Sequence, residues 1–196
     1  MNTICTIEII IAQRERILTM PKWVVDADHS VAAFSIRHMM IANVRGQFNK
    51  ISGTILFDPA NVLAASVDLT IDALNVFTGI QKRDDHLRSQ DFFDASIYPA
   101  ISFRSVRVDS ADCNQAKVVG DLTIRGITRQ MVVDVEFTGP VQDPFGEGSS
   151  IGFAATAMIN REDYGIMWNQ PMANGGIMVG RYVRLFIDIE ADLVND

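Results

Sequence analysis

The sequence predicts an all-β protein, a closed antiparallel lipocalin-like barrel of about eight strands with one helix at the barrel end. From residue 22 onward, apolar and polar side chains alternate with a period of two, the pattern of half-buried strands. Short links separate these segments, which favours antiparallel neighbours. No alternation of strands and helices indicates a parallel sheet. Closing the sheet removes the exposed edges that so many strands would otherwise have, so we expect a barrel.

Each expected strand has an apolar face. The clearest is the segment 65–72, where every second residue is apolar and the residues between them are Ser, Asp or Thr. In chain order, the residues expected to face inward are Phe34, Ile36 and His38; Ile51, Ile55 and Phe57; Ala65, Val67, Leu69 and Ile71; Ile101 and Phe103; Val118, Leu122 and Ile124; Met131, Val133, Val135 and Phe137; Ile151, Phe153, Ala155 and Ile159; and Val183, Leu185, Ile187 and Ile189.

The links between the strands contain turn residues. The segments 58–61, 109–112, 125–126 and 139–148 supply the Gly, Pro, Asn and Asp that tight reversals use, so we expect a turn at each. The segment 160–179 is longer, and segments of that length in a compact domain are usually functional or disordered.

The segment 79–91 is the only convincing helix. Thr78 precedes it, and Gln81 follows three residues later, which is the spacing of a capping box. Few of its side chains are apolar, so we expect it to cover an edge or end of the sheet. The charged residues 81–86 are most simply a solvated helix face, and a polar gate at a barrel mouth is the alternative.

The length of 196 residues fits one domain, which we place at 20–196. Residues 1–19 precede the strand pattern and are expected to be an extension outside the fold, with either Met1 or Met20 as the start. Their apolar stretch, 7–12, comes before the basic residues rather than after them, which is the wrong order for a signal peptide. We therefore expect a cytoplasmic protein, with the periplasm as the alternative.

Composition and motifs argue against several function classes. The 17 Lys and Arg against 24 Asp and Glu leave a net charge of -7, which disfavours nucleic acid as a partner. The longest apolar run falls short of the roughly 18 residues of a membrane-spanning helix, so we expect no stable membrane insertion. Cys5 and Cys113 are far apart and the histidines are not clustered, so we expect no metal site and no cofactor.

We also expect no enzymatic activity. The sequence has no nucleophile elbow, phosphate-binding loop, dinucleotide fingerprint or zinc-protease motif. His29, His38 and His86 are isolated, on an expected turn, strand and helix, and are interpreted as structural. Because His38 shares the face of Phe34 and Ile36, it is either hydrogen-bonded in the core or in contact with a ligand head group.

Four segments carry recognisable motifs. They are 23–48, with Trp23, Asp26, His29, Phe34, Ile36, His38 and Phe48; 85–103, with Asp85, His86, Leu87 and Arg88; 120–128, with Gly120, Leu122 and Gly126; and 161–165, with Arg161, Asp163 and Tyr164. In this order they resemble the YceI-like polyisoprenoid-binding proteins, from about residue 23 to residue 190.

The resemblance implies a barrel whose apolar lumen holds a long isoprenoid chain, of the kind found on isoprenoid quinones or polyprenyl phosphates. It implies binding for carriage or storage, without a catalytic centre. Some members of this family are exported and others carry no signal, and dimers occur, so a homodimer is possible. The alternative is a barrel filled by its own side chains, acting as an interaction or stress-response module without a lipid.

The ligand contacts follow from the inward faces and the resemblance. We expect the isoprenoid chain to lie against Phe34, Ile36, Phe48, Ile55, Phe57, Val67, Leu69, Ile71, Phe103, Leu122, Ile124 and Phe153. The polar head group is expected at His38, Arg83 or Asp84.

Overall fold

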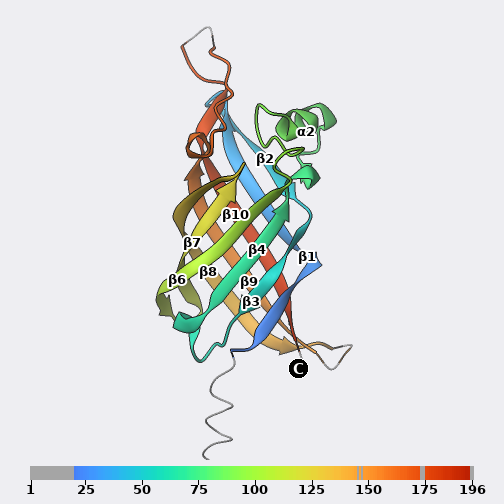
Figure 1. Cartoon of the computed structure of the whole chain (residues 1–196), viewed down its shortest axis with the longest axis vertical. Coiled ribbons are helices and arrows are strands. Elements are labelled where there is room, and N and C mark those ends of the chain that lie inside the picture. The colour runs from blue at the N-terminus through green and yellow to red at the C-terminus, as the bar shows by residue number, and fades with distance from the viewer. Residues whose placement is uncertain (1–19, 145, 147, 173–174, 195–196) are drawn as a thin grey trace, which may run out of the picture.

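A computed structural model describes residues 20–144, 146, 148–172 and 175–194, and the expected extension 1–19 lies outside the described residues. The chain forms one ten-stranded antiparallel sheet that closes on itself (Figure 1). Its strands are β1 (Lys22–His38), β2 (Ala42–Phe48), β3 (Ile51–Leu56), β4 (Ser66–Asp72), β5 (Val76–Phe77), β6 (Ala100–Asp112), β7 (Gln115–Ile124), β8 (Ile127–Gln142), β9 (Ser149–Asn160) and β10 (Val179–Leu193). Its helices are α2 (Gln81–Arg88) and the single 3₁₀ turns η1 (Val62–Ala64), η2 (Ala73–Asn75) and η3 (Arg161–Tyr164).

The pairing of β1 with β10 closes the barrel. It runs from Trp23 opposite Leu193 to His38 opposite Val179. The first residues of β1 pair with β3, and its second half pairs with β2, so β2 and β3 together occupy one position in the ring. The predicted closed barrel of about eight strands is thus confirmed. The additional strands arise because β2 is separate from β3, and because β5 adds a two-residue pairing to β2.

Two of the four predicted turns are confirmed. Asn61 donates its backbone N–H to the Asp58 carbonyl at 2.8 Å. Arg125 and Gly126 both have left-handed φ, 53° and 70°, which the two-residue turns of β-hairpins require.

The turn predicted at 109–112 is wrong, because these residues continue β6, and the reversal falls instead between Asp112 and Gln115, which pair with each other. Ladder pairing with β7 overrides the turn preference of the aspartates in this segment. The turn predicted at 139–148 is also shorter than expected, since β8 extends to Gln142.

The helix α2, the one α-helix among the described residues, lies at one end of the barrel, as predicted (Figure 1). It is shorter than the predicted 79–91, and the predicted capping box is wrong. Its N-cap is Ile80, without a side-chain hydrogen bond, because Thr78 instead donates its hydroxyl to the Asp84 carboxylate. Among the described residues, no helix combines the length and the apolar character needed to cross a bilayer.

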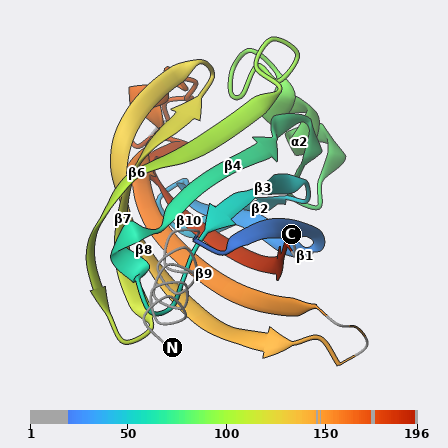
Figure 2. The same ribbon diagram turned by 60° about the horizontal axis from the view of Figure 1, so that its bottom comes forward.

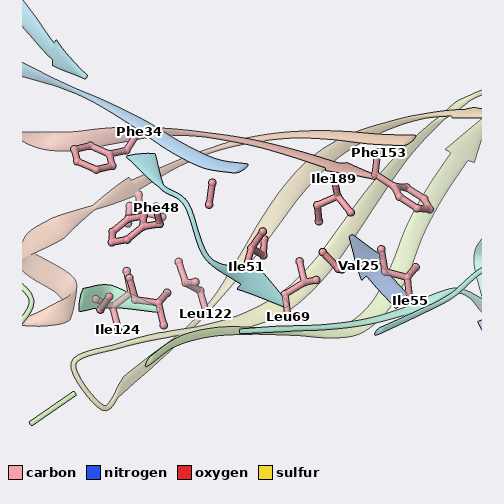
Figure 3. Packing of buried hydrophobic residues seen from close by; sticks show 14 of the residues in the cluster. Val25, Phe34, Phe48, Ile51, Ile55, Leu69, Leu122, Ile124, Phe153 and Ile189 are labelled. Carbon is pink, nitrogen blue, oxygen red and sulfur yellow. The ribbon is translucent and has the colours of Figure 1, made fainter. Parts of the chain in front are cut away.

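The inward faces of the strands form the core. Its buried side chains come from strands all around the ring, with Phe34, Phe48 and Ile124 at one side of Figure 3 and Ile55 and Phe153 at the other. Strands β6 to β9 curve around the far side of the interior from β1 to β4 (Figure 2). The barrel therefore encloses a long interior that runs from the α2 end to the opposite end.

His29 belongs to β1 rather than to a turn, at an irregularity in its pairing with β10. Its Nδ1 lies 2.7 Å from Oδ2 of Asp26, whose Oδ1 accepts the backbone N–H of Asp28 at 2.8 Å. The hydrogen bonds from His29 and Asp28 lower the pKa of Asp26, while the hydrogen bond and charge of Asp26 raise the pKa of His29. The two side chains therefore form an ion pair over a widened pH range.

This pair predicts a pH-dependent contribution to stability. The contribution of Asp26 to the free energy of unfolding is lost as pH falls through the lowered pKa of this residue. The contribution of His29 is complete below roughly pH 6.5 and is lost as pH rises through its raised pKa. We expect the melting temperature of wild type to exceed that of His29→Gln most clearly at roughly pH 4 to 6.5. A difference between the two proteins that stays constant from acid to alkaline pH would contradict this prediction.

Candidate ligand-binding site

The barrel interior contains a cavity of about 580 Å³, within the range of roughly 300–1,000 Å³ that is usual for small-molecule pockets. It is lined by every residue predicted to contact the isoprenoid chain, namely Phe34, Ile36, Phe48, Ile55, Phe57, Val67, Leu69, Ile71, Phe103, Leu122, Ile124 and Phe153. Side chains from widely separated strands are thus brought to one apolar surface. Whether they contact a ligand remains a prediction.

Three phenylalanines form the floor of the cavity. The rings of Phe137 and Phe153 lie 4.9 and 5.2 Å from that of Phe57, and both contacts are edge to face. Trp23 donates its indole N–H to the Phe57 carbonyl at 2.9 Å, which fixes the backbone there. The backbone N–H of Phe137 donates to the carbonyl of Asn114, which lies in the turn between β6 and β7. This turn is at the end of the barrel opposite α2, so the floor lies at that end as well (Figure 1).

Small residues widen the middle of the cavity. On β9, the side chains of Ala155 and Ala157 line the cavity, whereas that of Ala154 is exposed on the outer face of the barrel. On β7, a Cβ at Gly120 would lie 2.3 Å from Cζ of Phe103, so glycine at this position allows the phenylalanine ring to lie against the wall. These positions leave space that larger side chains would fill.

The cavity reaches the surface at the α2 end. Three residues that line the cavity are exposed, and all of them lie at this end: Arg37, Ile80 and Lys82. The three phenylalanines of the floor are buried. Here the His86 ring lies 4.8 Å from that of Trp168. We call this end the mouth.

Two of the three predicted head-group residues lie at the mouth. His38 lines the cavity, half-buried, and no hydrogen bond of its ring is found within the described part of the chain. Arg83 also lines it, and donates from Nε to Oγ1 of Thr78 at 2.7 Å and from Nη2 to the Thr78 carbonyl at 2.8 Å.

The third residue predicted for the head group, Asp84, does not line the cavity, and its contact with a ligand stays a prediction. Its side chain is only 3% exposed and accepts hydrogen bonds from the backbone N–H and hydroxyl of Thr78. Successive residues of a helix point about 100° apart, so Arg83 and Asp84 face different surroundings. Asp84 instead anchors the segment that enters the helix.

Several mouth residues were not among the predicted ligand contacts: Lys82, His86, Arg161, Trp168 and Met178. Lys82 and His86 belong to the segment 81–86, for which a polar gate at the barrel mouth was the alternative interpretation. Arg161 is only 3% exposed and donates from Nε to the Gly180 carbonyl at 2.8 Å and from Nη1 to the Ile166 carbonyl at 2.6 Å. Burial lowers the pKa of Arg161, yet a guanidinium keeps its charge throughout the physiological range. Burial also raises the pKa of the neighbouring Tyr164 to about 12, so its hydroxyl is neutral.

One group of potential metal ligands lies outside the cavity. Atoms of Asp26, His29 and Glu190 lie within 4.8 Å of one another, among the residues that the structure describes. Asp26 and His29 already bond each other, and both lie at or beside the irregularity in the pairing of β1 with β10.

Comparisons with known proteins extend over the whole barrel. Residues 23–191 match the family described as YceI-like domain. A UPF0312 protein of Vibrio cholerae is 39% identical over 138 residues, or 70% of this chain and 72% of that protein. The structure of Burkholderia cenocepacia BcnA matches with a TM-score of 0.74 and 25% identity over 85% of this chain and 98% of that one.

A more distant structure shares the fold. It is a polyisoprenoid binding domain from Saccharophagus degradans, implicated in plant cell wall breakdown. It matches with a TM-score of 0.64 at 16% identity, over 88% of this chain and 98% of that one.

Proposed function

Because this chain belongs to the YceI-like domain family, we propose that it is a non-catalytic carrier or reservoir that holds a long-chain isoprenoid lipid in its barrel lumen. The observation that carries the proposal is the apolar cavity that extends from the mouth to the phenylalanine floor. The fold that the chain shares with a domain described as polyisoprenoid-binding supports it.

The chemistry of the cavity suits an apolar chain. Each buried CH₂ group contributes roughly 0.8 kcal/mol, so several isoprene units give a large favourable term. The ordering of a flexible chain offsets much of that term. Since the middle of the lumen offers few polar partners, selectivity would depend on the length and width of the lumen. We therefore expect lipids of similar girth to compete with one another.

The floor limits the depth to which a chain can enter. Phe57, Phe137 and Phe153 pack against one another there, and neighbouring strands hold their backbones. The end of an isoprenoid chain would then meet these rings, while its polar group remains at the mouth.

Native mass spectrometry of protein purified without added lipid tests the proposal, with the bound mass identified after extraction. We expect a bound isoprenoid lipid, or its uptake when delipidated protein is given one. Titration provides a second measurement, because Trp168 lines the cavity whereas the other tryptophan, Trp23, does not. Ligand entry should change the fluorescence of wild type and leave that of Trp168→Phe nearly unchanged. Protein that is isolated empty and takes up no isoprenoid would overturn the proposal.

A further inference from the structure

The turn between β1 and β2 presents three consecutive apolar side chains to water. Met39, Met40 and Ile41 are 38%, 55% and 79% exposed. The backbone N–H of Met39 donates to the carbonyl of Met178, which lines the cavity at the mouth, at 2.7 Å. The turn therefore stands at the rim of the opening, at the α2 end of the barrel (Figure 1). We call residues 39–41 the tip.

The backbone conformation of the tip makes its residue types unexpected. The N–H of Ile41 donates to the carbonyl of His38 at 3.1 Å, and the two residues between them, Met39 and Met40, have left-handed φ of 51° and 62°. A turn of this kind favours Asn-Gly, because most side chains are strained at positive φ. Bulky apolar side chains thus occupy positions where turn stability alone would favour small polar ones. Local strain of this kind points to a function.

Two other segments add exposed apolar side chains to the rim. Ile80, just before α2, is 54% exposed and also lines the cavity. Met167, in the segment between η3 and β10, is 63% exposed and precedes the lining residue Trp168. The apolar surface of the lumen therefore continues outward onto the rim, over three segments that are far apart in the sequence.

A basic patch adjoins the tip on the outer face of the barrel. Arg45 on β2 and Arg184 on β10 both lie opposite Ser35 of β1, so the three residues form one row across three strands. Arg37 lies two residues nearer the tip than Ser35. The three arginines are exposed and line one outer groove, which no Asp or Glu of the described residues lines. We call Arg37, Arg45 and Arg184 the arginine patch.

The positive charge of the arginine patch is not offset locally. Within the part of the chain that the structure describes, no carboxylate forms an ion pair with any of the three guanidinium groups. The chain as a whole carries a net charge of -7, so this patch differs in sign from the average surface. A patch of this kind attracts a negatively charged partner.

The combination of apolar tip and arginine patch fits a bilayer surface better than a second copy of the chain. In a two-fold contact between copies, each arginine patch would face the other, and like charges repel. An anionic bilayer offers an apolar boundary for the tip and negative head groups for the arginines.

We propose that the rim of the mouth docks on an anionic bilayer, with the tip in the head-group layer and the arginine patch against the lipid phosphates. The contact is reversible and lies at the membrane surface. It turns the opening of the lumen toward the bilayer, so that a lipid passes between the two without crossing water. This route for the lipid rests on the proposed function, whereas the docking itself requires no bound lipid.

Vesicle flotation with the full-length, delipidated protein tests the inference. The vesicles contain phosphatidylcholine alone, or phosphatidylcholine and phosphatidylglycerol in equal parts. We expect the protein to float with the mixed vesicles and much less with the neutral ones. Binding to the mixed vesicles should weaken as salt is raised, because salt screens the exposed arginines.

The double variant Met39→Asn/Met40→Gly separates docking from a structural role of the tip. It removes two apolar side chains, so we expect binding to the mixed vesicles to fall at least about tenfold. Its melting temperature should equal or exceed that of wild type, because Asn-Gly suits a turn with two left-handed residues.

Two matched controls locate the effect at the rim. Leu63→Asn also removes an exposed apolar side chain, 61% exposed, but in η1 at the floor end, so it should leave vesicle binding unchanged. Arg45→Gln should weaken binding to the mixed vesicles. Arg107→Gln should not, because Arg107 pairs with Asp109.

The outcomes separate the docking from the proposed function. If wild type floats with neither kind of vesicle, or the double variant floats as well as wild type, the docking inference is overturned, and lipid uptake from detergent solution still supports the proposed function. If wild type is a dimer in solution and the double variant a monomer, the tip is an interface between copies and the inference is overturned as well. If the protein docks on vesicles as expected but takes up no isoprenoid, the docking stands and the proposed function fails.

Discussion

Replacing Ala155 by Phe is expected to abolish most lipid uptake, whereas the same replacement at Ala154 is expected to leave it unchanged. The Ala155 side chain lines the middle of the cavity, while that of Ala154 points outward from the same strand and is exposed. A ring at 155 would stand between the mouth and the floor. Exclusion of only two methylenes from the lumen costs roughly 1.6 kcal/mol of binding, so we expect at least a tenfold loss of affinity.

The two alanine variants are compared by native mass spectrometry and by titration with a geranylgeranyl ligand. Insertion of a large side chain into a well-packed core usually costs about 1–3 kcal/mol of stability, but a ring that enters open space should cost less. We therefore expect Ala155→Phe to stay folded, as judged by its melting temperature. Wild-type affinity in this variant would mean that the lipid chain does not pass β9.

The lining of the cavity could be predicted because it depends on a local property of the chain. In a strand, the side chain of every second residue points to the same face, so Val67, Leu69 and Ile71 had to lie together once the segment was read as a strand. Ladder pairing then places Leu69 opposite Phe103 on the next strand. Period-two alternation therefore specified which side chains face the lumen.

The mouth could not be predicted in the same way. The helix α2 is polar on most of its surface, so its sequence offers no apolar stripe to show that Arg83 faces the cavity and Asp84 does not. Trp168 and Arg161 lie at or after the end of β9, where no periodic pattern continues. Their positions depend on tertiary hydrogen bonds, such as those from Met178 and Val179 to the Asn169 side chain.

The alternation of residues also could not decide whether the lumen is open or filled. Both Phe57 and Phe103 line the cavity, but Phe57 is 3% exposed and packs against two other rings, whereas Phe103 is half-buried. The difference lies in the residues opposite, which are brought near only by the closed fold. Substitution at the two positions can therefore distinguish a packed core from a lined cavity.

We expect Phe57→Ala to cost about 3–5 kcal/mol in free energy of unfolding, the usual range for a large aromatic side chain in a packed core. Phe57 is 3% exposed and in edge-to-face contact with two rings, and its backbone carbonyl accepts from Trp23. Phe103→Ala should cost less than about 3 kcal/mol, because this side chain is only half-buried and no ring contact to it is found among the described residues.

Urea unfolding of delipidated protein measures both values, provided that the slope with denaturant stays constant among the variants. Phe103→Ala should also keep or increase its capacity for lipid, since it widens the lumen, whereas Phe57→Ala should deepen the floor and admit a longer chain. Equal losses of stability at the two positions, with no change in lipid binding at either, would favour a barrel filled by its own side chains. The cost at Phe103 is the decisive value, because a half-buried ring beside the cavity contributes less packing energy than a ring that is almost fully buried among other rings.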